Sequence, residues 1–237
     1  MSENGGGGGA MDGITKFQGG NRKLWAEHLN GLVAEKFANA CHSPPGLGGG
    51  QFCSDELGSV GNNVSLSGLE KHHRDRIPGL KRVIGVIDSI HVMPDSYPKV
   101  SVEIWSDLKG AAGAYSPGER LIKLAEDSPY NISTFAHEMG HHLSLEFGES
   151  KIEFLNKVKK DPELSVWLDA VRATPQHRIL LEAEGAGDNH SSYLRDSREL
   201  FSRSYSQWLS VKAAEKGSTV LKYQHDKIRE KTKGIYV

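Results

Sequence analysis

The residues with the clearest chemical potential lie in the segment FAHEMGHHLS, which spans residues 135–144. His137 and His141 are four positions apart, and Glu138 directly follows the first of them. On an α-helix, residues four apart lie on one face, so both imidazoles can bind the same ion. Neutral imidazole is a good ligand for zinc, and the glutamate would lie beside the ion, where a general base is needed. The spacing therefore predicts a zinc centre on a helix, with Glu138 as its base.

The alternative is a polar helix that carries histidines but no metal, because the chain has 11 histidines and the motif H-E-x-x-H is short. The surrounding sequence favours the metal. Pro129 stands where a helix can begin, and Asn131, Ser133 or Thr134 can cap it. Gly140, inside the motif, leaves room for the close approach of another element.

A catalytic zinc needs a third protein ligand. In the metzincin pattern this ligand would be a histidine at position 147, where the chain has Phe147. His142 points about 100° away from His141 on the same helix, so we expect it to be packed or solvated. The remaining candidates are carboxylates that follow the motif in the sequence. They are Glu146, Glu149, Glu153, Glu163, Asp169, Glu182, Glu184 and Glu199.

Glu199 differs from most of these carboxylates because it opens a predicted helix, residues 197–216, that has an apolar face. Such a helix is expected to be buried against the metal helix, and a carboxylate at its start would then face the site. The other interpretation is that Glu199 only complements the positive end of its own helix dipole. The residues alone leave both interpretations open.

A family resemblance favours the first interpretation. The segment SSYLRDSRELFSRSYSQWL, residues 191–209, resembles a segment of the anthrax lethal factor catalytic domain family. That segment has serine-tyrosine, a short spacer and E-x-F-A-x-A-F on a helix, and HEMGHHLS similarly resembles the family's H-E-F-G-H. The resemblance covers roughly residues 110–215. It implies a zincin-like fold of the gluzincin type, in which a small mixed sheet precedes the H-E-x-x-H helix and a helical C-terminal half carries the third ligand.

The same resemblance assigns roles to particular residues. It implies that Glu199 is the third ligand of a Zn²⁺ ion, beside His137 and His141, and that Tyr193 stabilises the oxyanion. The spacer between Tyr193 and Glu199 is one residue shorter than in lethal factor, and two serines stand where the family has alanines. If Tyr193 points away from the site, Tyr205 or His190 could replace it.

These roles imply a zinc metalloendopeptidase that hydrolyses peptide bonds with a metal-activated water. A protein or peptide substrate could add as an extra strand near residues 114–124, AYSPGERLIKL. One rival is a non-catalytic virion or partner-binding protein that retains the fold, and the intact Glu138 favours the enzyme over it. A second rival is a phage regulatory peptidase. The long separation between His141 and Glu199 counts against this second rival, because such enzymes place the third carboxylate closer.

The expected secondary structure places the strands before the helices, which indicates an α+β fold. Alternation and β-branched content predict strands at residues 81–94, 99–107 and 120–127. A short helix is expected at 65–76, and further helices at 151–160, 162–173, 175–185 and 197–216.

The first 63 residues are expected to lie outside the metallopeptidase domain, which we place at 64–237. Residues 1–20 hold eight glycines and are predicted to be a disordered leader. Residues 21–42 have the apolar spacing of an amphipathic helix, and 43–63 are rich in glycine and proline, as in a flexible linker. The stretch PPGLGGGQF in this linker resembles glycine-rich segments of tailed-phage head and portal-associated proteins, which favours a phage or prophage origin and would allow a role in phage-particle assembly.

Composition argues against several other classes of protein. The formal net charge is -1, so no overall field would attract nucleic acid or an anionic membrane. The N-terminus lacks the pattern of a secretory signal and no run is apolar enough for a membrane span, so we expect a cytoplasmic protein, with association with a virion as the alternative. Cys41 and Cys53 are expected to be free thiols.

Overall fold

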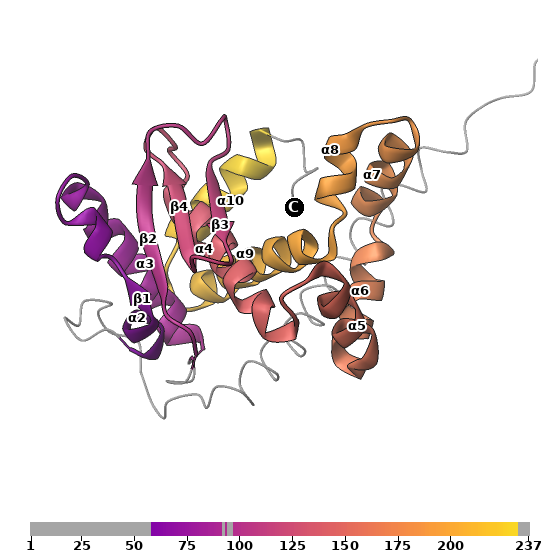
Figure 1. The fold of residues 1–237 in the computed structure, drawn as a ribbon, viewed down its shortest axis with the longest axis horizontal. Coiled ribbons are helices and arrows are strands. Elements are labelled where there is room, and N and C mark those ends of the chain that lie inside the picture. Colours follow the sequence, from indigo (N-terminus) through magenta and orange to yellow (C-terminus); the bar gives the residue numbers. More distant parts are fainter. Residues whose placement is uncertain (1–57, 92, 94–96, 232–237) are drawn as a thin grey trace, which may run out of the picture.

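The described part of the chain, residues 58–91, 93 and 97–231 of this computed structural model, combines a small sheet with many helices (Figure 1). The strands are β1 (Val64–Ser65), β2 (Val100–Trp105), β3 (Gly113–Ser116) and β4 (Leu121–Ala125). Their order in the sheet is β1-β2-β4-β3. β1, β2 and β4 are parallel, and β3 pairs antiparallel with β4. The expected α+β class, with a small mixed sheet, is confirmed.

The strands expected at 99–107 and 120–127 are confirmed as β2 and β4. β3 and β4 form a hairpin whose turn is closed by a 3.3 Å hydrogen bond from the Arg120 N–H to the Pro117 carbonyl. β3 is the last strand in the sheet order, so among the described residues one of its edges has no strand partner. This open edge belongs to the segment where strand addition was expected.

The helices are arranged around a contact between the metal-motif helix and the long helix after it. The described helices are α2 (Ser59–Asn63), α3 (Ile77–Ile90), α4 (Asn131–Ser144), α5 (Lys151–Lys160), α6 (Pro162–Arg172), α7 (Pro175–Gly185), α8 (Asn189–Leu194), α9 (Ser197–Glu215) and α10 (Val220–Lys231). α4 packs between the strands β3 and β4 and the helix α9, and α3 also contacts α4 and α9. Figure 1 shows α5 to α8 gathered beyond the start of α9, away from the sheet. The helices expected at 151–160, 162–173, 175–185 and 197–216 are confirmed.

The helix α4 forms where the metal motif predicted it. Phe135, Met139 and Leu143 are buried at helical spacing and hold it against the core. The expected N-cap is wrong, because Tyr130 occupies that position and no side chain of the helix start caps it. Instead, the Ser133 N–H donates to Gln224 Oε1 of α10 at 2.9 Å, so a helix from the end of the chain satisfies this orphan donor.

The strand expected at 81–94 is wrong, because residues 77–90 form the helix α3. The β-branched residues that suggested a strand also repeat at helical spacing, and Pro78 fits the first turn of a helix. The buried residues of α3 are Leu80, Val83, Ile84, Val86 and Ile87. Burial of this face against α4 and α9 outweighs the weak β propensity of the individual residues.

Two expectations near the start of the described chain also need correction. The end of the linker predicted at 43–63 is the helix α2, in which Val60 is fully buried. The carboxylate of Asp88 holds this helix by accepting the N–H groups of Val60 and Gly61 at 2.6 and 3.3 Å. The helix expected at 65–76 is instead two 3₁₀ turns, η1 (Ser67–Leu69) and η2 (Arg74–Arg76).

The leader expected at 1–20, the amphipathic helix expected at 21–42 and residues 43–57 of the linker lie outside the described residues, as do Cys41 and Cys53.

The third 3₁₀ turn, η3 (Leu145–Phe147), follows α4 directly and ends at Gly148, whose φ of 136° suits a residue without a side chain.

Candidate metal centre

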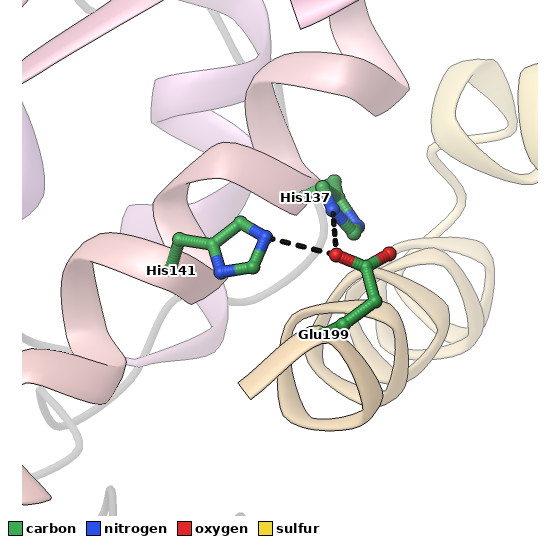
Figure 2. A group of neighbouring side chains, drawn as sticks. All are labelled: His137, His141 and Glu199. Carbon is green, nitrogen blue, oxygen red and sulfur yellow. Dashed lines mark hydrogen bonds and ion pairs between the residues drawn. The ribbon is translucent and has the colours of Figure 1, made fainter. Parts of the chain in front are cut away.

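Three side chains from α4 and α9 converge on one point (Figure 2). Glu199 Oε2 lies 3.5 Å from His137 Nε2 and 3.2 Å from His141 Nε2. One potential ligand atom from each residue lies within 4.8 Å of the others, and no other such group of three occurs in the part of the chain that the structure describes. The structure therefore brings together the two histidines predicted from their spacing and the carboxylate that the family resemblance favoured.

The close approach of α4 and α9 depends on a glycine. A Cβ atom at Gly140 would lie 2.7 Å from the Cα atom of Ser202 on α9, a distance at which the helices would have to separate. Ser202 itself is fully buried. The expectation that Gly140 permits close approach is confirmed, and the approach brings Glu199 to the histidines.

Glu199 is held as a buried anion. It is 4% exposed in the first turn of α9, where its charge also suits the helix dipole. Burial alone would raise the pKa of Glu199, but hydrogen bonds to His137 and His141 and the charges of these histidines hold it well below its usual range. Its other oxygen, Oε1, lies 3.3 Å from Arg203 Nε. Complementing the helix dipole is therefore not the only role of Glu199, because this carboxylate faces the two imidazoles.

Glu138 directly follows His137 on α4, and its Oε1 atom approaches Gly113 of the strand β3. It is 5% exposed, and burial raises its pKa to about 7, with the charge of Glu199 raising it further and the charge of His141 opposing. A carboxyl group with such a pKa can both accept and release a proton near neutral pH. Glu138 is therefore a buried carboxyl group with a pKa near neutrality, directly after one of the three potential metal ligands in the sequence.

The edge strand β3 lies directly against this carboxyl group. A Cβ atom at Gly113 would lie 2.4 Å from Thr134 Cγ2 and 3.2 Å from Glu138 Oε1. Only a glycine allows the strand to come this close to α4. The strand β3 and the Glu138 carboxyl group are therefore neighbours.

Tyr193 reaches the site from α8. Its hydroxyl donates a 2.8 Å hydrogen bond to Glu199 Oε2, the oxygen that faces both histidines. Burial and the nearby charge of Glu199 raise the pKa of the Tyr193 hydroxyl, so it stays protonated and able to donate. Of the proposed substitutes, Tyr205 is buried with its hydroxyl 2.7 Å from His91 Nε2, and His190 is exposed and stacks on the Tyr193 ring. Tyr193 is the better placed donor.

His142 is packed away from the other histidines, as expected. It is 1% exposed, with Nε2 2.9 Å from the Pro98 carbonyl and Nδ1 2.9 Å from the Tyr115 hydroxyl. Burial lowers the pKa of His142 to about 4; the charge of Arg120 acts in the same direction and the bond to Pro98 opposes it. His142 therefore joins the strand β3 to α4 as a neutral ring.

Sequence reasoning missed Gly113, Tyr115 and Arg203. Arg203 could have been found, because it lies four residues after Glu199 on one helix and so shares its face. Gly113 and Tyr115 matter because β3 docks on α4, and no local sequence pattern predicts this docking.

The described helices include none with the length and apolar character that crossing a bilayer requires. No family model, curated protein or solved structure matches the chain.

Proposed function

We propose that this chain is a zinc-dependent endopeptidase of the gluzincin type. One observation carries the proposal: the potential ligand atoms of His137, His141 and Glu199 lie within 4.8 Å of one another, and the buried Glu138 carboxyl group on α4 is close enough to His141 and Glu199 for their charges to shift its pKa. A purely structural metal site would need the ligands but not the neighbouring acid.

The donor set suits zinc. Two imidazole nitrogens and one carboxylate oxygen are the protein ligands of many catalytic zinc sites, which keep a further position open. When the two imidazoles are neutral, as metal ligands must be, the Oε2 side of this buried carboxylate has no positive charge beside it, which also favours a cation there. A bound zinc ion would supply Lewis acidity, activating a water molecule and polarising the carbonyl group of a substrate.

Glu138 would carry the proton. It lies next to the ligands and also next to the edge strand, so it can take a proton from the attacking water and deliver it to the leaving amine. Its burial keeps bulk water from competing for that proton.

Tyr193 would act on the substrate oxygen. Its protonated hydroxyl lies at the oxygen of Glu199 that faces the metal position, so a modest rotation would let it donate to a carbonyl oxygen as negative charge develops there. Tyr193 is 55% exposed, so the surrounding residues do not enclose it.

The substrate would lie along β3. This strand has an open edge among the described residues and passes directly beside Glu138, so an extended peptide hydrogen-bonded to it would bring its backbone to the acid. The expected region of strand addition, residues 114–124, overlaps this strand, and the proposed docking edge is β3 itself, Gly113–Ser116.

The test is metal content together with hydrolysis. The purified full chain should hold about one zinc per chain by elemental analysis and should cleave unfolded casein. Glu138→Gln should keep the zinc and lose roughly a hundredfold to ten-thousandfold in rate. Glu146→Gln, which changes an exposed carboxylate in η3, should alter neither.

Two results would contradict the proposal. A wild-type protein that binds no zinc would remove the metal centre altogether. A wild-type protein that binds zinc but cleaves no peptide bond would instead favour the non-catalytic virion or partner-binding protein considered above.

A further inference from the structure

The two carboxylate oxygens of Glu199 face different partners. Oε2 faces His137 Nε2, His141 Nε2 and the Tyr193 hydroxyl. Oε1 faces the guanidinium group of Arg203, with Nε at 3.3 Å. The carboxylate is therefore held at both ends, and only one oxygen is directed to the metal position.

Arg203 also contacts a second element. Its Nη2 group donates to the carbonyl oxygen of Leu194, the last residue of α8. α8 carries Tyr193 one residue earlier, so a single guanidinium group contacts both the carboxylate and the helix of the proposed oxyanion donor. The planar fork of arginine suits this double contact, whereas a lysine offers only a point charge.

Burial sets this pair apart from an ordinary surface pair. An exposed glutamate and arginine four residues apart on a helix contribute little. Here the side chains are only 5% exposed for Glu199 and 14% for Arg203. A buried pair is costly to break from one side, so removal of Arg203 would leave the Glu199 carboxylate without its Oε1 partner.

We propose that Arg203 is a positioning residue that fixes Glu199 as a one-oxygen metal ligand and ties it to the helix that carries Tyr193. This inference rests on the proposed metal centre. Without Arg203, the carboxylate could rotate and present both oxygens to the ion, and α8 would lose one of its attachments to α9. The contact between Arg203 and Glu199 is an ion pair, and outer partners that orient a metal ligand typically contribute 10-fold to 100-fold to metal affinity.

The experiment measures metal binding by the full chain, independently of activity. The protein is stripped with a chelator, and the zinc dissociation constant is measured by competition with a chromogenic chelator. Arg203→Gln should weaken zinc binding about 10-fold to 100-fold. Arg203→Lys keeps the charge but not the fork, so its loss should be smaller.

Cobalt(II) absorption provides a spectroscopic readout. Four-coordinate cobalt(II) absorbs much more strongly in the visible region than five- or six-coordinate cobalt(II). If Arg203 enforces binding through one oxygen, Arg203→Gln should lower the intensity of these bands as the second oxygen joins. A residue that merely stabilised α9 would not change the coordination number.

Arg198→Gln is the matched control. Arg198 is also on α9, adjacent to Glu199, but its guanidinium group donates to the Gly148 carbonyl at 3.1 Å. This variant should leave the zinc affinity and the cobalt(II) spectrum at the wild-type values. Thermal unfolding of each metal-free variant, followed by circular dichroism, checks that the chain is folded, and Arg203→Lys remains informative if Arg203→Gln does not fold.

The outcomes separate the two proposals. A wild-type chain that binds no zinc overturns the metal centre and, with it, this inference. A wild-type chain that binds zinc, with a folded Arg203→Gln or Arg203→Lys variant that binds equally well or more tightly and has an unchanged cobalt(II) spectrum, overturns the role of Arg203 alone.

Discussion

His141 and His142 are neighbours in the sequence but lie on different faces of α4. His141 faces α9, where its Nε2 lies 3.2 Å from a buried carboxylate oxygen. His142 faces the sheet, where a carbonyl group and a tyrosine hydroxyl meet its two ring nitrogens. The residue type is the same, so the partners of each ring decide its role.

The partners of His142 also fix its protonation. The Pro98 carbonyl can only accept, so Nε2 carries the proton in the 2.9 Å contact. With a pKa lowered to about 4 the ring is neutral, and Nδ1 then accepts from the Tyr115 hydroxyl. Both nitrogens are used by the protein itself, so this ring cannot bind a metal, whereas the His141 nitrogen faces a site shared with a second histidine.

The largest expected contrast is in zinc binding. His141→Ala removes a ligand and should weaken zinc binding by at least the roughly 100-fold typical of strong supporting contacts. His142→Ala should leave zinc affinity within a few-fold of the wild type if the variant folds. Chelator competition on the two purified variants measures both values, and equal losses in the two would refute the division of roles.

A second contrast is the dependence of stability on pH. The pKa of His142 falls from 6.5 to about 4 on folding, so the unfolded chain binds the proton more readily. The stability linked to this group is therefore complete above pH 6.5 and is lost as the pH falls toward 4. The full loss corresponds to about 3 kcal/mol of unfolding free energy.

The measurement is urea unfolding with a chelator present, at several values between pH 7.5 and 4, so that release of metal does not contribute. His142→Phe keeps an aromatic ring but cannot titrate, so its stability should fall less than that of the wild type. Parallel curves for the two proteins would show that His142 is not the group responsible.

Part of the candidate site could be predicted from the sequence alone. The spacing of His137 and His141 on α4 was readable because both lie on one element. Glu199 was one of eight carboxylates, and its place at the start of a helix with an apolar face set it apart. Only the family resemblance favoured it as a ligand over a helix-dipole role, because its contact depends on how α9 crosses α4 at Gly140.

Two wrong predictions, the strand in place of α3 and the N-cap of α4, have a common physical cause. The strand predicted in place of α3 reflected β-branched residues whose burial against other helices decides the outcome. The side chain that supports the start of α4 is Gln224, 91 positions away from its partner Ser133. Local patterns specify an element on its own, but not the side chains that distant elements supply to it.

A third prediction concerns the packing of β3 against α4 at Gly113. Gly113→Ala places a methyl group 2.4 Å from Thr134 Cγ2, so β3 must move away from α4 at a cost of about 1–3 kcal/mol. Peptide hydrolysis should fall, chiefly through a higher KM if the substrate pairs with this strand, while zinc content stays the same. Gly118→Ala is the matched control in the same hairpin, because its Cβ atom would meet nothing within 4 Å.

The smallest structural change removes a single oxygen atom. Tyr115→Phe deletes the hydroxyl that meets His142 Nδ1 at 2.9 Å and leaves a buried acceptor unpaired, which should cost about 1–3 kcal/mol of unfolding free energy. Because the lost bond joins β3 to α4, amide hydrogen exchange should quicken in Gly113–Ser116 more than in α9. Tyr223→Phe, at a residue 64% exposed on α10, should change neither. Uniform quickening across the whole chain would mean that the bond stabilises the fold generally and does not hold the edge strand in place beside Glu138.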